Sequence, residues 1–437
     1  MIRRIPFPKR SIHVPDYLEP DLTGGAYLYS KSEDVDNIFS YVVTLTMSVS
    51  ETVLSRTLEE ILQRFPHFAV RPVRKGESYV YESCDTPVRV YRSDSKPAGA
   101  FTCNDGRLFI VSYSHKTIYF DFHRALTDIK GALVFIRSVI FRYLQNTGYE
   151  VENDGGVLTL ETPFFEMEAE DALEGLEDIP ASRPVWYMDA KAHIDKTHCS
   201  SATNNVCQIH IPISSIKGEL KEGINMVSSF ITPFFSQCML EEYELDDNPA
   251  GEFIVSSIKI NLRQYFPTPT TRPFYIDATL AYNRKLADYP VSTVLMSQKK
   301  LLEAQLKSDA LAYNAQQKIK ILDDLRKLPS FGQKVAKAGE IFSNKASTAT
   351  YSLCNAGAAI MPESVNRYIT EFYPIVPAVL YPHSISAVIF KGDLVINVAS
   401  VSDNRELCRK FTALLNRYGM CSYISDDFKY TRLEYQP

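Results

Sequence analysis

The sequence predicts a soluble α/β protein built from two related lobes, and three observations favour this fold class. The chain has 437 residues, more than one hydrophobic core usually holds. Helical and strand patterns alternate along it instead of forming separate blocks. Each half also contains strands, then helices, then strands again. We therefore expect an N-terminal lobe over residues 1–190 and a C-terminal lobe over residues 191–437.

Composition and charge limit the classes of protein to which this chain can belong. Hydrophobic residues make up 45% of the sequence and charged residues 23%, as is usual for a globular protein. The net charge is −5 and basic residues form no stripe, so we expect no nucleic-acid partner. No apolar run approaches the ~18 residues of a membrane-spanning helix, and the first residues lack the apolar core of a signal peptide. We therefore expect a cytoplasmic protein without a membrane span.

The eight cysteines do not predict a metal site or a disulfide framework. None of them forms a Cys-x-x-Cys pair, and their spacing along the chain is irregular. Structural zinc sites and small secreted domains both need regular clusters of cysteine. We expect free thiols, no bound metal and no bound cofactor.

The first half alternates between helix and strand signals. Apolar residues at helical spacing predict a helix over residues 51–65, with Ser50 as its N-cap and Pro66 ending it. A broad apolar stripe predicts a second helix from about Lys130 to Leu144. Between the two helices, four short runs predict strands: Tyr79–Tyr81, Val88–Tyr91, Leu108–Tyr113 and Thr117–Phe122. The last two are separated by Ser114-His115-Lys116, which is typical of a hairpin.

An acidic segment follows the second helix. Residues 150–178 include eleven acidic residues and no Lys or Arg. Such a run is usually solvated, so we expect an exposed loop that leaves the first half.

The second half restarts with strand patterns and ends on a helix. A long mixed pattern predicts one helix from about Thr293 to Asp324. The final helix should begin at a capping box formed by Asp403 and Glu406, and Gly419 should follow its last turn. The predicted strands of this half are Val206–Ile213, Phe253–Ile260, Ile385–Phe390 and Leu394–Ala399.

The most informative segment joins a strand to the second helix. Its sequence, YFDFHRALTDIKGA over residues 119–132, resembles the HHxxxDG motif of acyltransferases that use coenzyme A or a carrier protein. This superfamily includes chloramphenicol acetyltransferase, the condensation domains of peptide synthetases and bacterial alcohol acetyltransferase-like proteins. Three further segments resemble the same superfamily in the same order. They are LEEILQRFPHF (58–68), INLR (260–263) followed by Phe266-Pro267, and TYSLCNAG (350–357) with Pro362-Glu363 after it.

The resemblance implies a fold, a site and a reaction. It implies two chloramphenicol-acetyltransferase-like lobes, each a mixed sheet flanked by helices, with a tunnel between them. The second histidine of the motif would take a proton from an alcohol or amine, which then attacks a thioester carbonyl. A coenzyme A thioester would be the co-substrate, or a carrier protein would deliver the acyl group. The motif aspartate would be structural, paired with an arginine that holds the loop.

Two positions depart from the motif. Aligned without a gap, Arg124 stands at the catalytic histidine and Ile129 at the glycine, whereas His123 matches the first histidine and Asp128 the aspartate. Arginine keeps its proton at physiological pH, so Arg124 cannot be a general base. The alternative is that His123 is the catalytic histidine, but this alignment requires a bulge near Arg124 to turn the side chain to the correct face.

Three residues of the second half are also assigned by the resemblance. Arg263 would pair with Asp128 across the interface between the lobes. Cys354 and Asn355 stand where the family has Ser-Asn, near the tunnel, and would contact substrate; the alternative is that they only form the turn before Gly357. Two hypotheses remain open at this point. The protein is an acyltransferase that uses His123 or an unusual base, or an inactive relative that binds a ligand or a protein.

Overall fold

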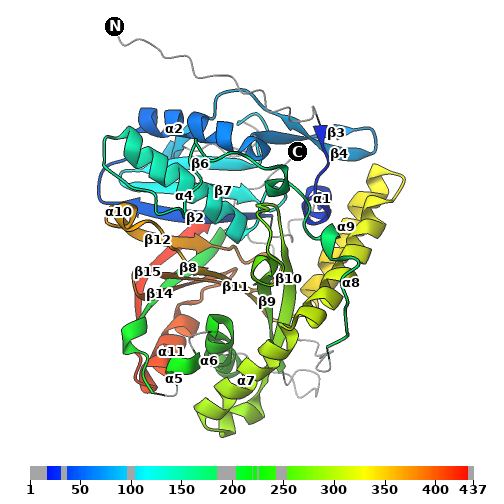
Figure 1. The fold of residues 1–437 in the computed structure, drawn as a ribbon. Coiled ribbons are helices and arrows are strands. Elements are labelled where there is room, and N and C mark those ends of the chain that lie inside the picture. The colour runs from blue at the N-terminus through cyan, green and yellow to red at the C-terminus, as the bar shows by residue number, and fades with distance from the viewer. Residues whose placement is uncertain are drawn as a thin grey trace.

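The computed structural model describes residues 17–30, 37–95, 104–184, 203–218, 220–223, 226–242 and 253–431. Two main sheets organise these residues, one of five strands and one of seven (Figure 1). Each sheet is mixed and carries helices, as the sequence predicts. The boundary predicted at residue 190 lies outside the described residues. No helix within the described ranges is long and apolar enough to cross a membrane.

The five-stranded sheet has the order β12-β2-β7-β6-β5. Its strands are β2 (Ile38–Leu45), β5 (Val90–Arg92), β6 (Phe109–Ser114), β7 (Thr117–His123) and β12 (Ile369–Ile375). Helices α2 (Glu51–Arg64) and α4 (Ile129–Asn146) pack against each other and lie together on this sheet in Figure 1. Both helices and the hairpin at His115 agree with the sequence, and Ser50 caps α2 by accepting a hydrogen bond from the Val53 N–H.

The seven-stranded sheet has the order β10-β9-β11-β13-β14-β8-β15. Helices α6 (Val227–Glu242) and α11 (Arg405–Arg417) pack against it and against each other. The strands are β8 (Thr203–Pro212), β9 (Phe253–Asn261), β10 (Tyr275–Asn283), β11 (Tyr351–Ala358), β13 (His383–Phe390), β14 (Asp393–Ser400) and β15 (Tyr423–Thr431). The parallel pairing of β11 with β9 and β13 carries residues 354–355 to the middle of this sheet.

One strand from late in the chain joins the sheet formed by the first half. β12 pairs antiparallel with β2, with Phe372 opposite Val43, and also contacts β13 of the larger sheet. The two sheets are therefore connected through residues 369–390. The remaining short elements are β1 (Tyr17–Leu18), β3 (Val70–Lys75), β4 (Ser78–Ser83), α1 (Leu22–Tyr29), α5 (Leu220–Gly223) and α10 (Glu363–Asn366).

The prediction of a single long helix over 293–324 is wrong in the number of helices, because the structure has two helices there. Helix α7 (Val291–Gln305) ends, the chain turns at Leu306 and Lys307, and α8 (Ser308–Arg326) begins. The turn lets α7 pack on α6 while α8 packs on α1 and α9 (Phe331–Ala346). Two different packing partners explain the break, since one straight helix could not reach both.

The predicted capping box at Asp403 is also wrong. The final helix begins at Arg405, and Asn404 occupies the N-cap position without a side-chain cap. Asp403 instead accepts a hydrogen bond from the Arg405 N–H at 3.0 Å and forms an ion pair with the Arg405 guanidinium. Gly419 does follow the last turn, with φ +83, as predicted.

The acidic segment is not uniformly exposed, contrary to the sequence-based expectation. Glu168 forms a bidentate ion pair with Arg64 at 2.9 Å for each contact, and both side chains are buried. Asp171 is half-buried, and its Oδ2 accepts a hydrogen bond from the Leu22 N–H at 2.6 Å. Partners on distant elements, α2 and α1, explain why sequence composition could not identify these two carboxylates as shielded from solvent.

Candidate functional site

Strand β7, the central strand of the five-stranded sheet, ends within the motif at His123. Its pairing with β2 runs without a register shift from Thr117 opposite Thr44 to His123 opposite Ile38. The ladder continues, since the His123 N–H donates to the Leu108 carbonyl and the Arg124 N–H to the Asn37 carbonyl. An inserted residue would break this alternation, so the bulge required to make His123 the catalytic histidine is absent from these residues.

His123 lies in the protein core. Its side chain is about 1% exposed, and its Nδ1 accepts a hydrogen bond from the Ala125 N–H at 3.1 Å. Burial, and then the neighbouring Arg124 guanidinium, lower the pKa of His123 to about 3. The imidazole is therefore neutral at physiological pH, and its Nδ1 is used in holding the loop that follows β7.

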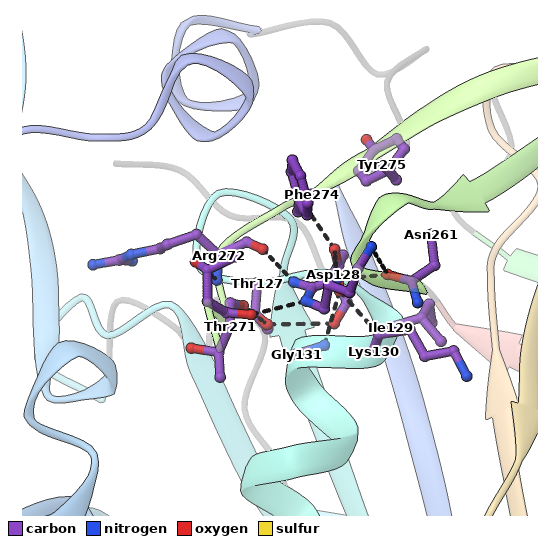
Figure 2. Close-up of polar contacts among 12 residues, drawn as sticks. Thr127, Asp128, Ile129, Lys130, Gly131, Asn261, Thr271, Arg272, Phe274 and Tyr275 are labelled. Atoms are coloured by element: carbon purple, nitrogen blue, oxygen red, sulfur yellow. Dashed lines mark hydrogen bonds and ion pairs between the residues drawn. The ribbon is translucent and has the colours of Figure 1, made fainter. Parts of the chain in front are cut away.

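Asp128 anchors that loop with four hydrogen bonds. Its Oδ1 accepts from the N–H groups of Lys130 (2.9 Å) and Gly131 (2.8 Å), which caps α4. Its Oδ2 accepts from Arg263 Nη1 and from the Phe274 N–H, both at 2.8 Å. Figure 2 shows Asp128 at the first turn of α4, between the backbone of that helix and the segment that carries Phe274. The pairing of Asp128 with Arg263 is the contact that the sequence predicts.

Arg263 extends the same network to the segment that precedes β10. Its Nε donates to the Thr270 carbonyl at 2.8 Å and its Nη2 to the Arg272 carbonyl at 2.6 Å. Gly131 adds a steric requirement, since a Cβ atom there would lie 2.1 Å from the Thr271 carbonyl oxygen. The start of α4 and residues 270–274 are therefore locked together by charge, hydrogen bonds and close backbone approach.

A small pocket lies where the loop after β7 and the first turn of α4 meet strands β9, β10 and β11. Of the six residues singled out from the sequence, four line it, and Arg263 reaches it through Asp128. His123 is not among the described residues of the lining. We call this space the Arg124 pocket; it is lined by Arg124, Asp128, Ile129, Lys130, Lys259, Asn261, Tyr275, Cys354 and Asn355.

Positive charge dominates the Arg124 pocket. Arg124 and Lys130 contribute cations, and Lys259 is partly charged at neutral pH because burial lowers its pKa to about 7. Asp128 is the acidic residue of the described lining and is already paired with Arg263. Burial lowers the pKa of Lys130, although Asp128 and Cys354 partly oppose this effect. The main cause of this shift is the loss of water around the ammonium group, and repulsion by the Arg263 guanidinium adds to it.

The remaining polar residues of the pocket do not supply a base. Burial is the main cause that raises the pKa of the Cys354 thiol to about 11, so the thiol stays protonated at neutral pH. Asn355 Oδ1 accepts a hydrogen bond from the Gly357 N–H at 2.8 Å, and Gly357 has φ +69. Asn355 therefore shapes the turn, as the sequence-based alternative proposes, while also lining the pocket.

Ile129 occupies the motif's glycine position in ordinary helical geometry. It is the first residue of α4, it is buried, and it is not one of the described residues with positive φ. Tyr41 donates a hydrogen bond to its carbonyl at 3.0 Å. The side chain reduces the space at the pocket wall, where the family's glycine would leave it open.

Comparisons with known proteins identify the fold. No family model and no curated protein matches the sequence. Among solved structures, polyketide synthase associated protein 5 from Mycobacterium tuberculosis has a TM-score of 0.60 at 12% identity, covering 92% of this chain and 98% of its own. TRI101 of F. sporotrichioides, complexed with coenzyme A and T-2, has a TM-score of 0.58 at 11% identity, covering 93% and 99%. The epimerization domain of tyrocidine synthetase B has a TM-score of 0.56 at 9% identity, covering 93% and 95%.

These likenesses confirm the fold class that the motif predicts. The chain has the two-lobed fold of acetyltransferases and condensation-type domains, over almost its full described length. At 9–12% identity, the likeness concerns the fold alone. What the site does must therefore be argued from its own residues.

Sequence reasoning missed three residues of the pocket, Lys130, Lys259 and Tyr275. Lys130 follows the motif directly, so its position could have been inferred from the helix N-terminus. Lys259 lies on β9 in the alternating run FIVSSIKIN, two residues before Asn261. The signal for Lys259 was a polar residue at an alternate position of the strand that runs into the INLR motif. The sequence contains no comparable signal for Tyr275.

Proposed function

We propose that this chain binds a small anionic molecule in the Arg124 pocket and does not catalyse histidine-dependent acyl transfer. One observation carries the proposal: Arg124, and not His123, lines the pocket. The guanidinium keeps its charge at any physiological pH and offers parallel N–H donors that match a carboxylate or phosphate. The ligand is accordingly a carboxylate or phosphate compound.

The surroundings of Arg124 support an anionic ligand. The guanidinium carbon lies 5.6 Å from the centre of the Phe39 ring, a cation–π contact that holds the side chain in place. Lys259 reaches the pocket from the opposite sheet, and burial lowers its pKa to about 7. An anion in the pocket would favour the charged forms of Lys259 and of Lys130, whose pKa burial also lowers.

Ordinary acyl transfer is the competing function, and the fold favours it. TRI101 is a structural neighbour complexed with coenzyme A, which makes acetyl-CoA the appropriate donor for a test. However, the reaction needs a proton acceptor near the acceptor hydroxyl or amine. His123 is buried away from the pocket, and the Cys354 thiol is protonated. We therefore favour binding over catalysis.

The first experiment measures thioester turnover. Purified protein is mixed with acetyl-CoA and a panel of alcohols and amines, and free thiol release is followed, with the His123→Ala variant in parallel. We expect no release above the background without protein, for either form. Turnover by the wild-type protein that disappears in His123→Ala would contradict the proposal.

The second experiment measures binding by calorimetry with succinate, citrate and inorganic phosphate. We expect saturable binding of at least one of them. Arg124→Gln should weaken it by at least about tenfold, as expected for one charge-assisted hydrogen bond in a buried site. Arg56→Gln is the matched control, because the Arg56 side chain is 69% exposed on α2. Equal losses in both variants would show that the effect is not specific to the pocket.

A further inference from the structure

Two lysines share one carboxylate at the wall of the Arg124 pocket. Lys259 on β9 and Lys345 on α9 both form ion pairs with Asp277 on β10, the Lys345 Nζ lying 2.6 Å from Asp277 Oδ2. The side chains of Lys259, Lys345 and Asp277 are only 14%, 23% and 28% exposed. We call them the Lys259–Asp277–Lys345 cluster. A single carboxylate balances one ammonium group, and burial disfavours a second charge, so one of the two amines is expected to give up its proton.

The amine that gives up its proton is Lys259. Burial lowers its pKa to about 7, and the Lys345 and Arg124 cations add to this effect although Asp277 opposes it. Burial also disfavours the charged form of Lys345, but Asp277 outweighs it and raises the pKa of Lys345 above its usual value. A substantial share of Lys259 is therefore a neutral amine at neutral pH, whereas Lys345 stays an ammonium group.

A neutral lysine amine is a nucleophile that small molecules can reach here. Its nitrogen carries a free electron pair, and burial next to another cation is one way in which proteins keep a lysine in this form. Lys259 lines the Arg124 pocket and also a second narrow space, which Tyr27, Phe342 and Lys345 line as well. The amine is thus accessible to a small molecule that enters either space.

The size and the charge of the surroundings select the electrophile. Both spaces are narrow, so a small electrophile fits best. Carbon dioxide is among the smallest electrophiles that react with amines, and its product with an amine is an anion. Lys345 and Arg124 place positive charge near the Lys259 amine, and this charge favours an anionic product. An aldehyde would give an uncharged imine, which gains nothing from these cations.

We propose that Lys259 is a modification site at which carbon dioxide forms a carbamate. The Nζ electron pair forms a bond to the carbon of carbon dioxide, one C–O double bond becomes a single bond to a charged oxygen, and the nitrogen releases one proton to solvent. The product carries one negative charge near Lys345 and Arg124, and the step needs no oxidant or reductant. This inference goes beyond the function proposed for the Arg124 pocket, because it requires no ligand other than carbon dioxide.

The test is chemical trapping of the carbamate on the full chain. The protein is incubated with ¹³C-labelled bicarbonate, which is in equilibrium with carbon dioxide, and triethyloxonium tetrafluoroborate then converts any carbamate into a stable ethyl ester. Peptide mass spectrometry locates the ¹³C label. We expect the label on Lys259 and not on Lys300, an exposed lysine of α7. A short peptide with a free α-amine, whose usual pKa is about 8, is added to the same sample as the positive control.

Two variants separate a carbamate on Lys259 from non-specific labelling. Lys259→Arg keeps a cation beside Asp277 and should lose the label, because a guanidinium holds its proton at neutral pH. In Lys345→Met, Lys259 is the one lysine of the cluster left to pair with Asp277, so its amine should keep its proton. The label on Lys259 should then fall by about tenfold, the change in neutral amine that one pKa unit produces. Lys300→Met is the matched control and should label like the wild type.

Three results would overturn the proposal. The first is an unlabelled Lys259 in a sample in which the added peptide is labelled. The second is labelling of Lys259 and Lys300 to the same extent. The third is an unchanged label on Lys259 in Lys345→Met, provided that circular dichroism shows this variant to be folded.

Discussion

Replacing Asp128 by asparagine tests the anchor that joins the two sheets. Asparagine keeps an oxygen to cap α4 through Lys130 and Gly131, but it turns an N–H₂ group toward the donors Arg263 Nη1 and Phe274 N–H. The substitution therefore removes the acceptor on one side and leaves the helix cap intact. Only the contact between the sheets is lost.

The magnitude follows from the burial of the pair. The side chains of Asp128 and Arg263 are 9% and 15% exposed. Removing one partner of a buried ion pair costs about 3–5 kcal/mol of unfolding free energy, and the slight exposure argues for the lower end, about 3 kcal/mol. Asp128→Ala also removes the helix cap, which adds about 1 kcal/mol. We expect the order of stability wild type, Asp128→Asn, Asp128→Ala.

The assay is urea denaturation followed by circular dichroism. Glu174→Gln serves as the control, because Glu174 pairs with Arg326 at the surface, where the two side chains are 45% and 46% exposed. An exposed pair contributes about 0–1 kcal/mol. If Asp128→Asn changed the free energy of unfolding no more than Glu174→Gln does, the anchoring role of Asp128 would be refuted.

Three further predictions concern buried charges. Glu168→Gln should lower the unfolding free energy by about 3–5 kcal/mol in urea, because it leaves Arg64 buried without its carboxylate; a wild-type midpoint would contradict this. Burial is the main cause that raises the pKa of Asp21 to about 7, so the wild type loses stability as the pH rises from about 4 to 7. Asp21→Asn should therefore gain stability relative to the wild type by up to about 4 kcal/mol between pH 4 and pH 8, and an equal difference at both pH values would exclude this. Since the pKa of His123 is lowered to about 3, its imidazole should stay neutral from pH 5 to pH 8, and the folded state should lose stability as the pH falls below about 6.5. NMR shifts of the ring that titrate near pH 6.5 would show that His123 is solvated instead.

The sequence predicts the anchor better than the rest of the site. Asp128 and Arg263 each belong to a segment that resembles a family motif. Because the resemblance pairs the motif aspartate with an arginine, the contact between these two side chains could be predicted. The hairpin at His115 and the helices over 51–65 and 130–144 follow from local patterns that their own residues determine. These features need no knowledge of which strands are neighbours.

Contacts between distant residues outside the recognised motifs are not predicted. The Lys259–Asp277–Lys345 cluster joins two strands and a helix, and no local pattern reports that these three side chains meet. The same reason applies to Glu168, whose acidic neighbours suggest solvent although Arg64 encloses it. Pairing of distant elements, and not composition, decides whether such a charge is buried.

The strand ladder decides between the two alignments of the motif. His123 donates its N–H toward β6 and Arg124 toward β2, so the backbone alternates normally through both residues. Side chains alternate with the backbone, and His123 and Arg124 therefore point to opposite faces. Of these two side chains, Arg124 lines the pocket, and His123 is not part of the described lining. For His123 to act there, the ladder would have to slip by one residue, which would also move Phe122 and Phe120 out of the core. The packing of the phenylalanines on β7 thus keeps Arg124 at the position of the motif's second histidine.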